Sequence, residues 1–106
     1  KSKSPLELYI NHKSNHLLRQ SAVLMISNIL MDNDKFEDSI LLLEKFNTSN
    51  NSSFYDNMIA IQKAKVFYNS GNKIACKNII DILLGKENLT LRQKQIVEEL
   101  FSYNQG

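Results

Sequence analysis

Residues 27–39 read SNILMDNDKFEDS and residues 64–76 read AKVFYNSGNKIAC, and the pattern that these two stretches share predicts the fold. They are offset by thirty-seven residues, and each begins and ends with a small side chain twelve positions apart: Ser27 with Ser39, and Ala64 with Cys76. Small residues at matched positions let two helices approach closely. The repeated pattern therefore predicts two helical hairpins, one at residues 15–46 and one at 54–84.

Apolar residues recur every three or four positions on both sides of these stretches, which is the spacing of an amphipathic helix. No stretch alternates between apolar and polar residues as a strand would. The sequence predicts an all-α fold and one domain over residues 1–106, because a chain of this length has room for one core. The predicted helices span 5–11, 15–32, 35–46, 54–70, 73–84 and 91–103.

Capping residues mark the predicted helix boundaries. A serine, threonine or aspartate stands three positions before an acid or amide at four helix starts: Ser4–Glu7, Asp34–Glu37, Ser53–Asp56 and Thr90–Gln93. Such pairs form capping boxes, which satisfy the free amide groups of a first turn. Gly71 and Gly85 stand where helices should end in the left-handed conformation. The polar run from Asn47 to Ser53 is expected to be a loop.

The last predicted helix, 91–103, is followed by only three residues of this sequence and has no partner helix after it. We therefore expect it to cap the end of the helical stack. Its apolar residues Val97, Leu100 and Phe101 should lie against helix 73–84, while its polar side faces water.

Composition argues against several classes of protein. Thirteen basic and eleven acidic residues leave a net charge of +2, too small to indicate nucleic acid or anionic lipid as the main partner. The lone Cys76 cannot form an internal disulfide or a four-cysteine zinc site. No apolar run approaches the roughly 20 residues of a membrane span. The chain opens with Lys1 and shows no signal peptide, so we expect a soluble piece of a longer protein.

Residues able to carry catalysis or bind a metal are few. His12 and His16 lie four apart, but Ser14 between them is typical of a helix cap and no third ligand stands nearby. Cys76 occupies a position where the repeat needs a small buried residue, so packing is its expected role. No phosphate-binding glycine motif occurs. We expect no enzyme activity, no catalytic residue, no metal and no cofactor.

Both predicted hairpin turns resemble those of the tetratricopeptide repeat (TPR) family. The first is Asp34-Lys35-Phe36-Glu37-Asp38-Ser39-Ile40, with Phe36 as the aromatic and Ser39 in place of alanine, and the second is Gly71-Asn72-Lys73-Ile74-Ala75-Cys76. The tryptophan, tyrosine and proline landmarks of the family are mostly absent, and the offset exceeds the usual thirty-four, which the 47–53 loop absorbs. The resemblance implies hairpins stacked as a short right-handed solenoid of five to six helices.

A narrower resemblance spans residues 9–85. Its third motif, a helix end, a polar turn and a new helix start, is Asn11-His12-Lys13-Ser14-Asn15-His16-Leu17-Leu18. Together with the two turns it is similar to the TPR-like domain of the bacterial ancillary Sec-translocon subunit family. Members of that family carry one amino-terminal membrane anchor and a periplasmic TPR region that serves protein contacts. The resemblance implies a tethered, non-catalytic scaffold on the periplasmic side of the inner membrane; without it, a cytoplasmic location is expected.

In a TPR-like stack the first helices of successive hairpins line a concave surface on which a protein or peptide partner docks. Carrying the family pattern over places seven residues on or near that surface: Leu24, Asn28, Met31, Ile61, Lys65, Tyr68 and Asn69. Leu24 and Ile61 stand where the carboxylate-binding members carry lysine, so a more apolar groove is favoured. Whether these two side chains line the groove or belong to the core stays open.

Two other functions stay open beside this one. Five lysines near aromatic residues would suit a helical-repeat module that binds nucleic acid: Lys63, Lys65, Lys73, Lys77 and Lys86. Only Arg19 and Arg92 could make bidentate phosphate contacts, so a protein partner is expected rather than nucleic acid. The third function is self-association, to a homo-oligomer, through an unfinished repeat end.

Overall fold

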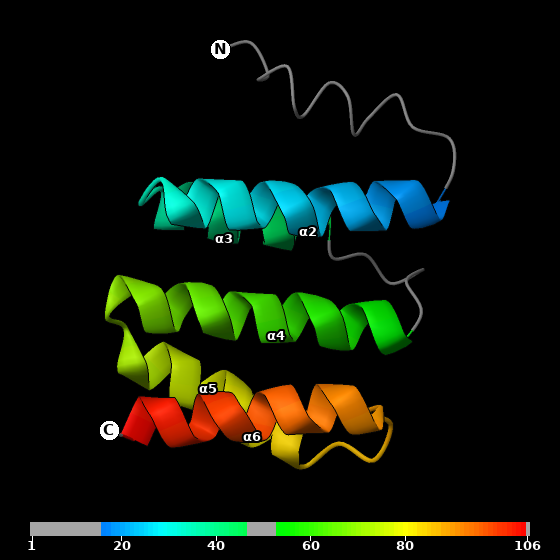
Figure 1. The fold of residues 1–106 in the computed structure, drawn as a ribbon, viewed down its shortest axis with the longest axis vertical. Coiled ribbons are helices and arrows are strands. Elements are labelled where there is room, and N and C mark those ends of the chain that lie inside the picture. The colour runs from blue at the N-terminus through cyan, green and yellow to red at the C-terminus, as the bar shows by residue number, and fades with distance from the viewer. Residues whose placement is uncertain (1–15, 47–52, 106) are drawn as a thin grey trace, which may run out of the picture.

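The computed structural model describes residues 16–46 and 53–105 of the chain, with side chains from Gln20 onward. Five helices make up this part of the molecule: α2 (His16–Asp32), α3 (Phe36–Lys45), α4 (Ser53–Ser70), α5 (Lys73–Leu84) and α6 (Leu91–Gln105) (Figure 1). The described ranges contain no strand, and the predicted all-α fold is confirmed. The predicted helix 5–11 and most of the predicted 47–53 loop lie outside these residues.

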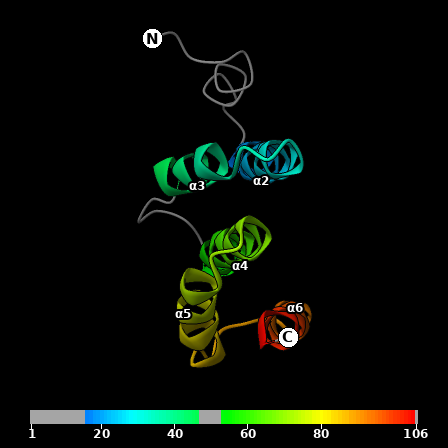
Figure 2. The ribbon, with the colours of Figure 1, turned by 90° about the vertical axis from the view of Figure 1, so that its left-hand side faces the viewer.

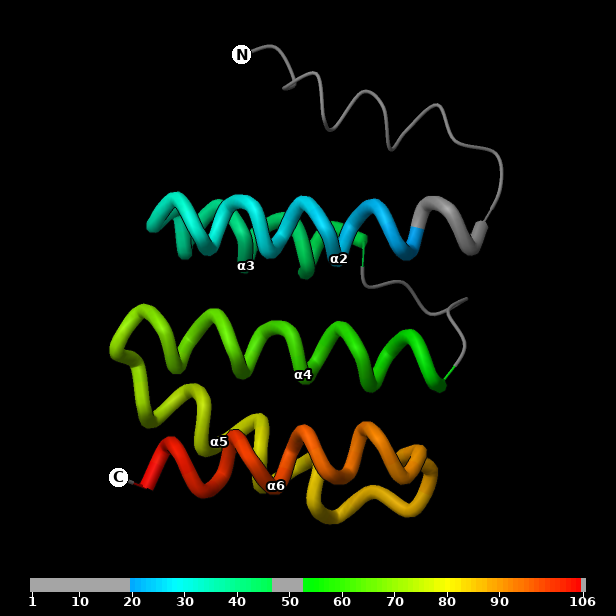
Figure 3. Tube along the Cα trace, viewed as in Figure 1, coloured from blue at the N-terminus to red at the C-terminus, as the bar shows by residue number. Residues whose placement is uncertain are grey.

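The helix boundaries agree closely with those predicted from the apolar spacing. Helix α5 has the predicted bounds, and α2, α3 and α4 each differ by one residue at one or both ends. Helix α6 continues two residues past the predicted end. In the tube drawing, α2, α4 and α6 run in one direction and α3 and α5 return in the other (Figure 3).

The turns after α2 and α4 have the same hydrogen bonds, shifted by thirty-seven residues. After α2 the backbone amides of Lys35 and Asp34 donate to Leu30 O (2.8 Å) and Met31 O (3.0 Å), and after α4 those of Asn72 and Gly71 donate to Phe67 O (2.9 Å) and Tyr68 O (3.2 Å). This pair of bonds is the Schellman pattern that ends a helix. The sequence repeat is therefore also a repeat of backbone structure.

Both Schellman turns need a left-handed residue, and different residue types supply it. Gly71 has φ of 88°, as predicted, whereas Asp34 has φ of 62°. Asp34 thus ends α2, and the capping box predicted for Asp34 and Glu37 is wrong: the residue before α3 is Lys35, whose side chain forms no cap hydrogen bond. Gly85 also departs from its prediction, because its φ of −84° is right-handed.

Side-chain caps fix the starts of α5 and α6. Asn72 accepts a hydrogen bond from the Ala75 amide at 3.1 Å. At α6 the predicted box is confirmed, since Thr90 Oγ1 accepts from the Gln93 amide (3.1 Å) and Gln93 Oε1 accepts from the Thr90 amide (3.0 Å). Gln93 is itself buried and also donates to Phe54 O at 3.1 Å, so the cap ties α6 to the start of α4.

Helices α4 and α6 each contact both helices of the pair that precedes them in the chain. Helix α2 packs on α3, and α4 packs on both; α4 likewise packs on α5, and α6 packs on both. Seen along the helices, α2, α4 and α6 lie on one side and α3 and α5 on the other (Figure 2). Helix α6 therefore packs on the α4–α5 pair in the same way as α4 packs on the α2–α3 pair.

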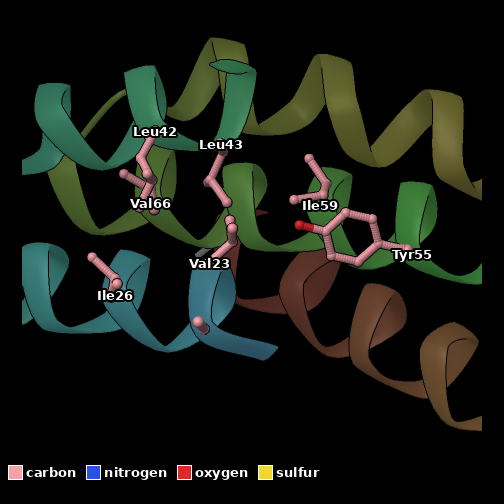
Figure 4. Packing of buried hydrophobic residues seen from close by; sticks show 8 residues of the cluster. Val23, Ile26, Leu42, Leu43, Tyr55, Ile59 and Val66 are labelled. Carbon is pink, nitrogen blue, oxygen red and sulfur yellow. The ribbon is translucent and has the colours of Figure 1, made fainter. Parts of the chain in front are cut away.

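This arrangement divides the core into two clusters that share α4. The first cluster joins α2, α3 and α4: Ala22, Val23, Ile26, Leu42, Leu43, Tyr55, Ile59 and Val66 (Figure 4). The second joins α4, α5 and α6: Ile61, Ala64, Cys76, Ile80, Leu83, Val97 and Leu100. Val97 and Leu100 lie in the core as predicted for a covering helix. Phe101 also lies on the side of α6 that faces α5, although its side chain is 36% exposed beside the hollow between the two helices.

Candidate functional site

The small residues singled out in the sequence lie at the centre of each three-helix contact. In the first pair, Ser27 and Ser39 are both fully buried, and their hydroxyls are 2.6 Å apart. Ser39 Oγ also lies 3.0 Å from Ser27 O. Gln62 of α4 reaches in and donates to Ser27 Oγ at 3.2 Å. We call Ser27, Ser39 and Gln62 the first junction, in which hydrogen bonds link all three helices.

The equivalent contact in the second pair contains no hydrogen-bonded side chains. Ala64 and Cys76 replace the two serines after thirty-seven residues, and Leu100 replaces Gln62 after thirty-eight. We call Ala64, Cys76 and Leu100 the second junction. Burial raises the pKa of the Cys76 thiol, because the apolar surroundings disfavour the charged thiolate. The packing role predicted for Cys76 agrees with this environment.

The core also holds one of the seven residues predicted to bind a partner. Ile61 is fully buried in the second cluster, among residues of α4, α5 and α6, and its assignment to a binding surface is corrected. Leu24, its counterpart in α2, is half-buried against the first cluster. The sequence does not decide whether these two side chains line the groove or belong to the core. The structure places Ile61 in the core.

Three of the predicted residues meet across the contact between α2 and α4. The Asn69 side-chain amide lies 3.4 Å from the Met31 sulfur. Asn28 is exposed and its Oδ1 accepts from Gln62 Nε2 at 2.6 Å, which connects this surface to the first junction. Asn69 also donates to Lys65 O in its own helix at 2.8 Å, which orients its side chain.

Another predicted residue, Tyr68, lies where α4 meets α6. Tyr68 is half-buried, and its ring centroid is 6.4 Å from that of Tyr103 at a tilt of 38°. Tyr103 is 59% exposed and was not among the predicted residues. Shifting Lys65 by thirty-eight residues gives Tyr103, and shifting it back by thirty-seven gives Asn28. Extending the repeat into the last helix would therefore have found it.

These side chains form one surface along the three first helices. We define the front face by its members: Leu24, Asn28 and Met31 of α2, Lys65, Tyr68 and Asn69 of α4, and Tyr103 of α6. Among the described residues none forms a salt bridge with Lys65. The face offers amides, phenols, a thioether and a single cation, which suit the polar and apolar contacts of a protein surface.

Two hollows lie between helices, and both include side chains from α5. One of about 330 Å³ lies between α4 and α5 and is lined by Asp56, Ala60, Lys63, Ile79, Ile82 and Lys86 among others. The other, of about 220 Å³, lies between α5 and α6, beside Ile74 and Phe101. Their linings include no member of the front face.

Metal-binding chemistry is not assembled in the part of the chain that the structure describes. No group of three or more histidine, cysteine, aspartate or glutamate residues is gathered there. His12 lies outside the described residues, as does the side chain of His16. None of the described helices is long and apolar enough to cross a membrane. No family model, curated protein or solved structure matches the chain.

Proposed function

We propose that this chain is a TPR-like, non-catalytic domain that binds a protein or peptide partner through its front face. The support is threefold: the turn geometry repeats at thirty-seven residues, small residues occupy both junctions, and α4 and α6 each contact the pair of helices before them. A stack built in this way presents its first helices side by side as one extended surface.

The observation that carries the proposal is the row formed by Asn28, Lys65 and Tyr103. They occupy one repeat position in three successive first helices and are half-buried or exposed. A segment lying across α2, α4 and α6 would meet one of them at each step, and an amide, a cation and a phenol can each hydrogen-bond to peptide carbonyls. The resemblance of residues 9–85 to the ancillary Sec-translocon subunit family also implies an envelope location. Fractionation of cells that make the full-length protein would test this location.

Photo-crosslinking in cells that make the full-length protein tests the function. A photoreactive amino acid is placed at Asn69 or Tyr103 on the front face, and at Asp38 of α3 or Asn78 of α5 as matched exposed controls. We expect a discrete protein adduct from the front-face positions and none from the controls. Adducts of the same size from both sets, or from the controls alone, would contradict the assignment of the face.

Nucleic-acid binding is less well supported by the lysines. Lys63 lies 3.6 Å from Glu44, and Lys77 lies 2.8 Å from Asp81, so two of the five are already paired with carboxylates. A phosphate-binding surface would lose affinity steeply as salt rises, by about one power of the salt concentration for each phosphate contacted. Titration of single-stranded RNA at two salt concentrations separates this function from a protein-binding face.

A further inference from the structure

The hollow of about 220 Å³ lies between the first turns of α5 and the last turn of α6 (Figure 1). The two helices are joined there by a hydrogen bond of 3.1 Å from the Asn104 side chain to Lys73 O. The apolar part of the lining comes from Ile74, Ile80 and Phe101. Ile74 is 77% exposed and Phe101 is 36% exposed, so this apolar lining is open to solvent and to a partner.

The repeat shows which side chains occupy the equivalent place in the first pair of helices. Lys73 and Lys77 of α5 correspond to Phe36 and Ile40 of α3, thirty-seven residues earlier. Phe36 and Ile40 are half-buried and pack against the first cluster, whereas both lysines are exposed. The second pair therefore lacks the aromatic ring and the aliphatic chain that cover this part of the core in the first pair.

The size of the hollow indicates what kind of group can occupy it. Pockets for drug-sized molecules have volumes of about 300–1,000 Å³, which exceeds the volume of this hollow. An apolar cavity of about 150 Å³ is large enough to hold benzene. The hollow therefore fits one aromatic side chain, such as the phenyl ring that Phe36 supplies at this place in the first pair.

The charged side chains at the hollow are all positive. The described residues that line it include Lys73 and Lys77 and no acid. Lys77 lies 2.8 Å from Asp81 of its own helix, whereas no salt bridge among the described residues involves Lys73. A carboxylate brought in beside the aromatic ring would be attracted by these lysines, and a cation would be repelled.

We infer that this hollow binds an aromatic side chain of a protein segment that carries an acidic residue next to it. The ring packs on Ile74 and Phe101, and the neighbouring carboxylate pairs with Lys73. Phe101 adds the offset or edge-to-face contact that two aromatic rings prefer. The site lies outside the front face, so it does not depend on the function proposed for that surface.

Nuclear magnetic resonance on the unmodified, isotope-labelled chain tests the inference with three capped tripeptides. We expect the Glu-Phe-Glu peptide to shift the signals of Ile74 and Phe101 in a saturable way. The Glu-Ala-Glu and Lys-Phe-Lys peptides, which lack the ring or the acids, should bind more weakly. Adenosine monophosphate also combines a ring with an anion and should bind more weakly too. Equal or tighter binding of any of these three, or no shift with Glu-Phe-Glu at its solubility limit, would overturn the inference.

Two substitutions of Lys73 separate the hollow from the charge. Lys73→Phe restores the residue type of Phe36, so it should fill the hollow and abolish the shift of Phe101 by Glu-Phe-Glu. Lys73→Gln leaves the hollow open and should weaken binding about threefold. Lys94→Gln, at an exposed position of α6 outside the hollow, is the matched control for the lost charge. Unchanged binding by Lys73→Phe, or equal effects of Lys73→Gln and Lys94→Gln, would contradict the site, and melting curves check that each variant is folded.

Discussion

The two junctions occupy equivalent places and are built from opposite chemistry. At the first, Ser27, Ser39 and Gln62 hold three helices together through buried hydrogen bonds. At the second, Ala64, Cys76 and Leu100 do so by apolar contact alone. The backbone around them is the same, down to the Schellman bonds of the turns.

The comparison indicates that the fold constrains the size of the side chains at a junction more than it constrains their polarity. A buried hydrogen bond contributes about 1 kcal/mol net, whereas a buried polar group left without a partner costs about 1–3 kcal/mol. Each junction avoids that cost, because the polar side chains of the first are hydrogen-bonded to one another and the side chains of the second are apolar. We therefore expect substitutions to be tolerated when every buried polar side chain keeps a partner and to be costly when one is left without a partner.

The largest effect should come from removing the helix that completes the second junction. A chain ending at Gly85 lacks Val97 and Leu100 and uncovers Ile80 and Leu83, which are fully buried. At about 25 cal/mol for each Å² of apolar area exposed, this loss favours aggregation or dimer formation. Light scattering should detect it. A folded monomer would mean that α6 is not needed to cover the second cluster.

Exchanging one residue between the junctions should have unequal effects. Leu100→Gln places an amide in an apolar junction, and we expect it to cost about 3 kcal/mol from lost burial and an unpaired polar group. Gln62→Leu leaves the Ser27–Ser39 hydrogen bond in place and should change stability by less than about 1 kcal/mol. Urea unfolding measures both. Equal losses of unfolding free energy in the two variants would contradict the view that the cost comes from leaving a buried polar group without a partner.

Increasing the size of a junction residue tests whether the fold limits side-chain size at a junction. Ala64→Leu adds bulk where the side chain is fully buried between α4 and α5, and we expect a loss of about 2 kcal/mol. The exposed Lys86 is the control, and Lys86→Ala should stay within about 0.5 kcal/mol. An unchanged thermal melt for Ala64→Leu would show that the small side chain does not set the helix spacing.

The smallest effect concerns the turns, where the two pairs differ by one residue type. Asp34 has the left-handed conformation that Gly71 adopts without strain, so Asp34→Gly should raise the free energy of unfolding by about 0.5 kcal/mol. Gly71→Ala should lower it by about 1 kcal/mol, although the space around Gly71 is open. If both substitutions have the same sign, backbone strain does not govern these turns.

The fold class and the helix boundaries could be predicted because they depend on local sequence. Apolar spacing and the Thr90–Gln93 box act within one helix, and both predictions are confirmed. Gly85 could not be assigned in this way, because a glycine permits a left-handed end without requiring it. The sequence predicts Asp34 at the start of α3, although Asp34 ends α2, because aspartate suits both roles.

The candidate site was harder to predict because it depends on contacts between helices. Ile61 is apolar on a helix that packs in both clusters, and the sequence of α4 alone cannot show which of its apolar residues the neighbouring helices cover. As a polar residue, Gln62 would be expected at the surface. It is buried because Ser27 and Asn28 of another helix accept its hydrogen bonds. Tyr103 is not among the predicted residues, because the prediction of α6 as a capping helix does not extend the repeat position of Asn28 and Lys65 into that helix.

Cys76 gives the molecule a built-in reporter of local opening. It is the sole thiol of the chain, and it is fully buried within the second junction. A thiol reagent can reach it only while α5 is separated from its neighbours, so under native conditions the labelling rate measures how often that happens. Compared with the rate of global unfolding, this single number would reveal whether the two halves of the stack come apart together or one at a time.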